Sequence, residues 1–126
     1  MDEIRIKQKQ EARGERRGWI IYLLHLSHPK PLSLRSLMRN LDFYNLPLSR
    51  QRLANKLEFL RDCDLLRVFP LGTESVLSDI DQAKLIQRYG DSDGEMDSLT
   101  CAMLTARGVR FQEGYVDEIG VVRING

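Results

Sequence analysis

The sequence predicts an α+β domain in which three helices precede a small antiparallel pair of strands. Apolar residues recur at helical spacing in three successive segments, and two later segments are short, apolar and rich in residues that favour strands. The 126 residues, of which 42% are hydrophobic and 29% charged, suit one domain with a single core. We therefore expect a single domain over residues 1–126.

Composition narrows the class of protein. No apolar run approaches the ~20 residues of a membrane-spanning helix, and residues 1–17 are charged throughout, without a signal-peptide region. We expect a cytoplasmic protein with no membrane partner. Cys63 and Cys101 lack the CxxC spacing of zinc sites. Both are expected to be reduced thiols, with a disulfide between them as the alternative, and no metal or other cofactor is expected.

The net charge of +1 conceals an asymmetry along the chain. Residues 1–61 contain 13 Lys and Arg against 6 Asp and Glu, whereas residues 62–126 contain 6 against 12. A basic half of this kind is typical of proteins that contact phosphates. The acidic half would face away from such a partner or pair with another subunit.

Residues 1–27 predict a polar helical extension that is followed by an apolar helix. Residues 1–17 form a polar helical extension, which we expect to be a surface-lying or frayed end; a basic arm against a duplex and a dimerisation helix are the alternatives. Residues 18–27 are apolar around most of a helix circumference and predict the core helix, which Pro29 and Pro31 end. This core set comprises Trp19, Ile20, Leu23, Leu24 and Leu26.

Residues 31–45 and 46–69 carry the clearest helical signals. Ser33 can cap a helix whose apolar stripe is Leu34, Leu37, Met38 and Leu41. After the turn at Pro47, Ser49 can cap a third helix that ends near residues 62–64. The inward stripe of this third helix is Leu53, Leu57 and Leu60. Residues 65–69 then predict a strand.

Residues 70–98 form a long insert before the next strand. Residues 78–89 predict a helix capped by Ser78, with Ile80, Ala83 and Ile86 inward; residues 84–89 could instead form a strand. Residues 98–105 predict a strand that pairs with residues 65–69 as an antiparallel hairpin. Thr105 can cap a last short helix in an appendage over residues 105–126, which ends with GVVRI as a strand.

The element order, together with the stretch LSRQRLANKLEFLRDCDLLRV, resembles the winged helix-turn-helix superfamily. That stretch resembles its recognition helix and first wing strand, and LTARGVRFQEG resembles the segment after the wing. With the closing GVVRI, the latter is similar to small winged-helix proteins of Mu-like bacteriophages. The resemblance covers about residues 18–114. It implies a three-helix core, a hairpin wing and sequence-specific binding of double-stranded DNA.

The expected DNA surface follows from the matching positions and the side-chain chemistry. Amides can pair with adenine and guanidinium groups with guanine in the major groove. The predicted base-reading residues are Ser49, Arg50, Gln51, Arg52 and Asn55. The predicted phosphate contacts are Lys30, Arg35, Arg39 and Lys56, with the N-terminal basic run adding to them.

A small transcriptional regulator is the expected function, and one alternative stays open. A winged-helix module that binds protein and not DNA is favoured by the acidic second half, the acidic insert and Phe59 on the outer helix face. A homodimer would use the same features. An enzyme is not expected, because no nucleophile, acid–base pair or phosphate-binding glycine loop is recognisable.

Overall fold

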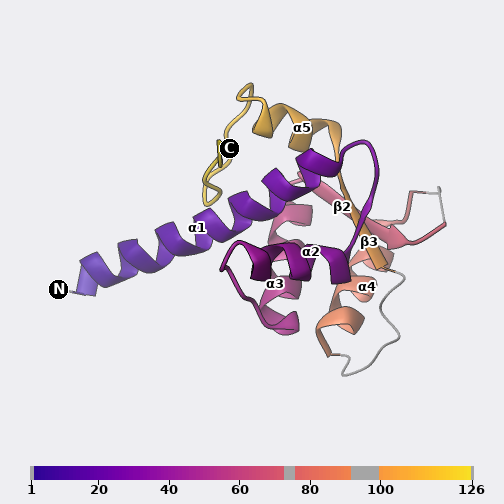
Figure 1. Cartoon of the computed structure of the whole chain (residues 1–126), viewed down its shortest axis with the longest axis horizontal. Helices are drawn as coiled ribbons and strands as arrows, with labels where there is room; N and C mark the ends of the chain where they lie inside the picture. The colour runs from indigo at the N-terminus through magenta and orange to yellow at the C-terminus, as the bar shows by residue number, and fades with distance from the viewer. Residues whose placement is uncertain (1, 73–75, 92–99, 126) are drawn as a thin grey trace.

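The structure is a computed structural model and describes residues 2–72, 76–91 and 100–125, with side chains from residue 12 onward. Within these residues the chain forms five helices and one three-stranded antiparallel sheet (Figure 1), which confirms the predicted α+β class. The helices are α1 (Asp2–Ser27), α2 (Leu34–Phe43), α3 (Arg50–Asp62), α4 (Asp79–Asp91) and α5 (Ala106–Gln112). The strands are β1 (Leu32–Ser33), β2 (Leu66–Pro70) and β3 (Thr100–Leu104).

The sheet has the order β1-β3-β2, so the last strand in sequence is central. Ala102 on β3 is paired with Leu32 of β1 on one side and Val68 of β2 on the other. The β2–β3 pairing confirms the predicted hairpin, although residues 98 and 99 of the predicted strand lie outside the described residues. With β1 placed between α1 and α2, the arrangement is compatible with a winged-helix fold.

The core lies between one face of the sheet and α1, α2 and α3. The predicted stripes face it: the buried residues are Ile20, Ile21, Leu23 and Leu24 of α1, Leu34, Leu37 and Leu41 of α2, and Leu53, Leu57 and Leu60 of α3. Leu26 was expected in this core but is 59% exposed. It lies roughly 200° around the helix from Leu24, so it points away from the side that packs.

The joint between α3 and β2 depends on Asp64, which adopts a left-handed conformation with φ of 59°. Just beyond it, Leu65 N–H donates to the carbonyl of Leu60 at 3.0 Å, the bond that closes a helix in the Schellman motif. Asn45 has the same role after α2, with φ of 60°. Asp and Asn tolerate this conformation better than most residues, so both turns around α3 form without glycine.

The insert between β2 and β3 contains α4, so the helical alternative for residues 78–89 is correct. Its inward face differs from the prediction. Ile86 is buried as expected, but Ile80 is 69% exposed, and Gln82 and Tyr89 are buried instead. Positions 82, 86 and 89 follow the i, i+4, i+7 spacing of one helical stripe, and Ile80 lies outside this register.

The buried Gln82 completes the outer edge of the sheet. Its Oε1 accepts a hydrogen bond from the backbone N–H of Val68 at 3.1 Å, and its Nε2 donates to the carbonyl of Leu77 at 3.0 Å. A side-chain amide therefore satisfies a backbone donor that an edge strand would otherwise leave unpaired.

The C-terminal segment corrects another prediction. Thr105 caps α5 as expected, since its Oγ1 accepts from the N–H of Gly108 at 3.1 Å. The closing GVVRI, however, is not a strand, because it runs along α1 and not beside a sheet edge. Val122 N–H donates to the carbonyl of Gly14 at 3.0 Å. A Cβ at Gly18 would lie 1.7 Å from the carbonyl oxygen of Val122, so the close contact requires glycine there.

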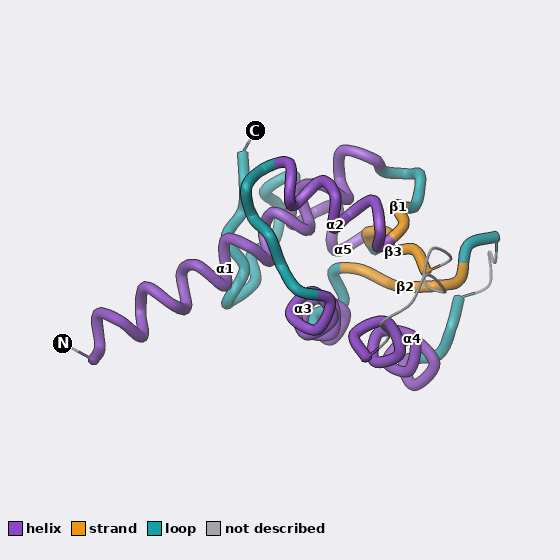
Figure 2. The backbone as a smooth tube through the Cα atoms, turned by 60° about the horizontal axis from the view of Figure 1, so that its bottom comes forward, coloured by secondary structure: helices purple, strands orange, loops and turns teal. Residues whose placement is uncertain are grey.

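Helix α1 is continuous from the extension into the core. Figures 1 and 2 show its N-terminal part projecting beyond the rest of the molecule, while its C-terminal part lies against the other helices. Over the described residues, none of the helices has the length and apolar character needed to cross a bilayer.

Candidate nucleic-acid interface

The first two turns of α3 present the predicted base-reading side chains to solvent. The helix begins after Ser49, whose Oγ accepts the N–H of Arg52 at 3.2 Å and so caps a free amide. With its apolar stripe directed into the core, the helix leaves Gln51, Arg52 and Asn55 exposed. Four of the five predicted base-reading residues, Ser49 included, therefore share one accessible surface.

Two of these residues are bonded to each other. The Nε2 of Gln51 donates to the Oδ1 of Asn55 at 3.1 Å, across one turn of the helix. Both side chains are exposed, so exchanging this bond for bonds to a base edge would cost little. The pair presents donors and acceptors of the kind that adenine accepts in the major groove.

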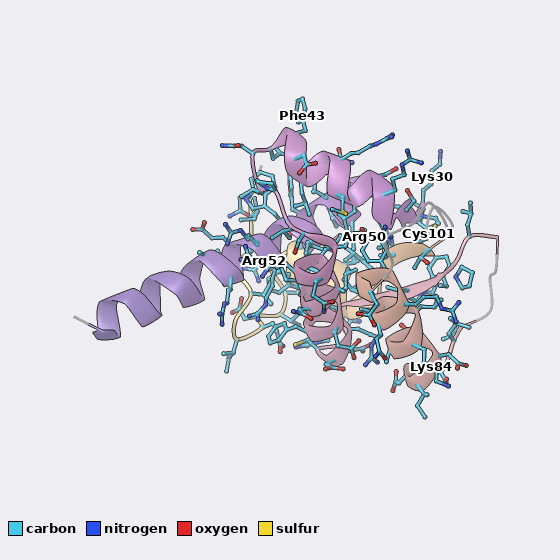
Figure 3. The ribbon with its side chains drawn as sticks, turned by 90° about the horizontal axis from the view of Figure 1, so that it is seen from below. Lys30, Phe43, Arg50, Arg52, Lys84 and Cys101 are labelled. Atoms are coloured by element: carbon cyan, nitrogen blue, oxygen red, sulfur yellow. The ribbon has the colours of Figure 1, made fainter. Side chains whose placement is uncertain are left out.

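Arg50 is placed differently from the other predicted readers. It is half-buried, and its guanidinium lies 4.4 Å from the centre of the Tyr89 ring on α4. Figure 3 shows Arg50 near the junction of α3 and α4, whereas Arg52 lies on the side of α1. Contacting a base with Arg50 would require breaking its stacking on Tyr89.

Helix α4 covers this flank of α3 along its length, in the antiparallel direction. At one end a Cβ on Gly90 would lie 2.9 Å from the Cβ of Ala54. At the other end Arg61 pairs with Asp79 at 3.4 Å and also hydrogen-bonds Glu58. In the C-terminal half of α3, the charge of Arg61 is therefore balanced by carboxylates, and α4 covers one flank of the helix. The flank that faces α1 is the one that a ligand can reach.

On the α1 side lies a groove of about 660 Å³, which we call the basic groove. It is lined by Ala12, Arg13, Arg16 and Arg17 of α1, by Leu48, and by Arg52, Asn55 and Lys56 of α3. Five of these eight residues are cationic, and no carboxylate is among the described residues that line it. The arrangement places two rows of positive charge opposite each other.

The charges of the basic groove perturb one another. Burial, followed by the neighbouring arginines Arg17, Arg16, Arg13 and Arg52, lowers the pKa of Lys56 to about 8. Burial and Arg13 also lower the pKa of Arg17. Burial is the larger cause, and the part of the shift that comes from the neighbouring arginines reflects a positive potential that a bound anion would reduce.

Arg17 is fixed within this groove. Its guanidinium lies 3.7 Å from the centre of the Phe59 ring, and its Nη1 donates to the carbonyl of Gly120 at 3.1 Å. Among the described residues, no carboxylate pairs with Arg13, Arg16, Arg52 or Lys56. The four groups are therefore available to a common anionic ligand.

The remaining predicted phosphate contacts are not in the basic groove. Arg35 and Arg39 are exposed on α2, and Lys30 is exposed before β1. Figure 3 places Lys30 well apart from Arg52. Of the four predicted phosphate contacts, only Lys56 lines the basic groove. The other cations that line it, apart from Arg52, are the arginines of α1. The sequence did contain a signal for this cationic face, because Arg13, Arg16 and Arg17 have the i, i+3, i+4 spacing that puts three side chains on one side of a helix.

A second cleft, of about 850 Å³, lies between α5, the start of α4 and strands β2 and β3. Its charged lining is mixed, with Arg67 and Arg110 opposed by Asp79 and Glu113. It therefore lacks the uniform charge of the basic groove and indicates no particular ligand.

No family model matches this chain, and comparisons with curated proteins and with solved structures likewise gave no match.

Proposed function

We propose that this protein is a small DNA-binding regulator of the winged helix-turn-helix class, with the N-terminal half of α3 in the major groove of double-stranded DNA. The observation that carries the proposal is the basic groove, which adjoins the exposed turns of α3. Phosphate contacts supply most of the affinity of such proteins, and base-edge contacts supply the specificity. Here both kinds of side chain lie on adjoining surfaces.

The division of roles follows from side-chain chemistry. Gln51 and Asn55 would bond adenine edges, and Arg52 would address guanine or a neighbouring phosphate. Lys56 would bind the backbone from inside the basic groove. Arg50 would contribute only after leaving Tyr89, so we assign it a smaller part in base reading.

Fluorescence anisotropy with a labelled random-sequence duplex tests the proposal. The wild type should bind at low salt and lose most of its affinity near 0.2 M salt. The double variant Arg52→Gln, Lys56→Gln should reduce the slope of log K against log salt by about 0.9 if Arg52 contacts guanine and by about 1.8 if it contacts a phosphate, since each phosphate contact contributes about 0.9.

The matched control is Lys84→Gln, Arg88→Gln, which removes two exposed charges from α4. It should leave the slope close to that of the wild type. Absence of wild-type binding at low salt would rule out the proposed function.

A module that binds protein and not DNA is the second candidate. It is favoured by α4, which covers one flank of α3 and narrows the surface that could enter a major groove. It predicts no salt-dependent binding to any duplex, so the same titration separates the two candidates.

A further inference from the structure

Helix α1 carries a row of cations on the side that faces α3. Arg13, Arg16 and Arg17 are spaced i, i+3, i+4, so they lie on one face of the helix, and all three line the basic groove. Arg13 and Arg17 are separated by about 6 Å along the axis, nearly two base-pair steps of ~3.4 Å. The row is therefore long enough to meet more than one phosphate of a strand.

The row is held in place before any ligand arrives. Residues of the C-terminal segment contact α1 beside the row: Val122 N–H donates to the carbonyl of Gly14, and the carbonyl of Gly120 accepts from Arg17. A positively charged surface on a fixed helix loses little conformational entropy on binding.

The opposite side of α3 is unsuited to a phosphate backbone. There α4 presents the exposed carboxylates of Asp79, Asp81 and Asp91, with Lys84 and Arg88 among them. A duplex in contact with α3 would therefore be attracted toward α1 and not toward the side of α4 and the β2–β3 hairpin. Charge complementarity thus selects the direction in which the duplex extends.

We propose that α1 is the second DNA-contacting element of this protein, with Arg13 and Arg16 binding the phosphate backbone that borders the groove contacted by α3. The inference rests on the proposed function. It assigns to α1 the DNA contact beside the recognition helix that the wing makes in the winged-helix arrangement expected from the sequence. Arg17 supports the row but is already bonded to Gly120, so it contributes mainly through its charge.

The test is the salt dependence of duplex binding by the full chain with Arg13→Gln, Arg16→Gln. The slope of log K against log salt should fall by about 1.8, so that raising salt from 0.05 to 0.2 M costs this variant about tenfold less affinity than it costs the wild type. Arg13→Lys, Arg16→Lys keeps both charges and should restore most of the slope.

The control Lys84→Gln, Arg88→Gln removes the same charge from α4 and should not change the slope. A wild-type slope in the Arg13→Gln, Arg16→Gln variant, with binding retained, overturns the role of α1 and leaves the proposed function intact. Equal losses in this variant and the α4 control also overturn it, because net charge alone would then explain both. Failure of the wild type to bind any duplex overturns both proposals.

Discussion

Lys56 makes the proposed DNA binding dependent on pH in an unusual range. Its pKa lies at about 8 in the free protein, because it is half-buried and faces Arg17, Arg16, Arg13 and Arg52. A bound phosphate stabilises the charged form and returns this pKa toward its ordinary value. Binding therefore takes up a proton, and the affinity should fall as the pH rises through 8.

The size of the effect follows from the fraction of protonated Lys56. With a pKa of about 8, roughly 90% of the free protein is protonated at pH 7 and roughly 10% at pH 9. If the bound form stays protonated, the affinity for duplex DNA falls by about tenfold between these values. Solvent screening of a partly exposed ammonium reduces the loss toward threefold.

The assay is duplex binding by anisotropy at constant ionic strength from pH 7 to pH 9, with Lys56→Arg as the matched variant. Arginine keeps its charge over this range, so the affinity of the variant should vary much less with pH. Parallel pH profiles for the wild type and Lys56→Arg would refute the reasoning, because the proton would then be taken up elsewhere.

Three further predictions concern the fold and one thiol. Gly18→Ala should lower the free energy of unfolding by about 1–3 kcal/mol, because the new Cβ overlaps the carbonyl of Val122; an unchanged melting temperature in calorimetry would contradict this contact. Gln82→Ala should cost about 1–3 kcal/mol in urea unfolding, since it leaves the N–H of Val68 unpaired, and wild-type stability would argue against it. Burial raises the pKa of Cys63 to about 11. At pH 8 iodoacetamide should therefore label it about tenfold more slowly than a free thiol, as followed by mass spectrometry; labelling at the free rate would exclude the raised pKa.

The local signals in the sequence predicted most of the framework. Apolar spacing and the caps Ser33, Ser49 and Thr105 located α2, α3 and α5, because these features depend on neighbours within one or two turns. The inward face of α4 was predicted incorrectly for the opposite reason. Gln82 is buried because of a backbone donor on β2, a contact that hydrophobic periodicity does not report.

The site was partly predictable. Exposure of Gln51, Arg52 and Asn55 followed from the stripe on the other face of α3. The stacking of Arg50 on Tyr89 and the convergence of α1 on α3 depend on tertiary contacts between distant segments. GVVRI has the composition of a strand, yet the position of Gly18 allows it to pack on α1 instead.

The bond between Arg17 and Gly120 also bears on how the molecule folds. It joins residues 103 positions apart, far beyond the separations within α2, α3 and their turn. Contacts of such separation form slowly, because the intervening chain must first lose its freedom. The hydrophobic core, which includes the C-terminal half of α1, can therefore assemble before the C-terminal segment docks on α1. During refolding, the capacity to bind a polyanion should therefore recover in a later kinetic phase than the helical signal. A newly folded molecule would be compact before it can bind DNA.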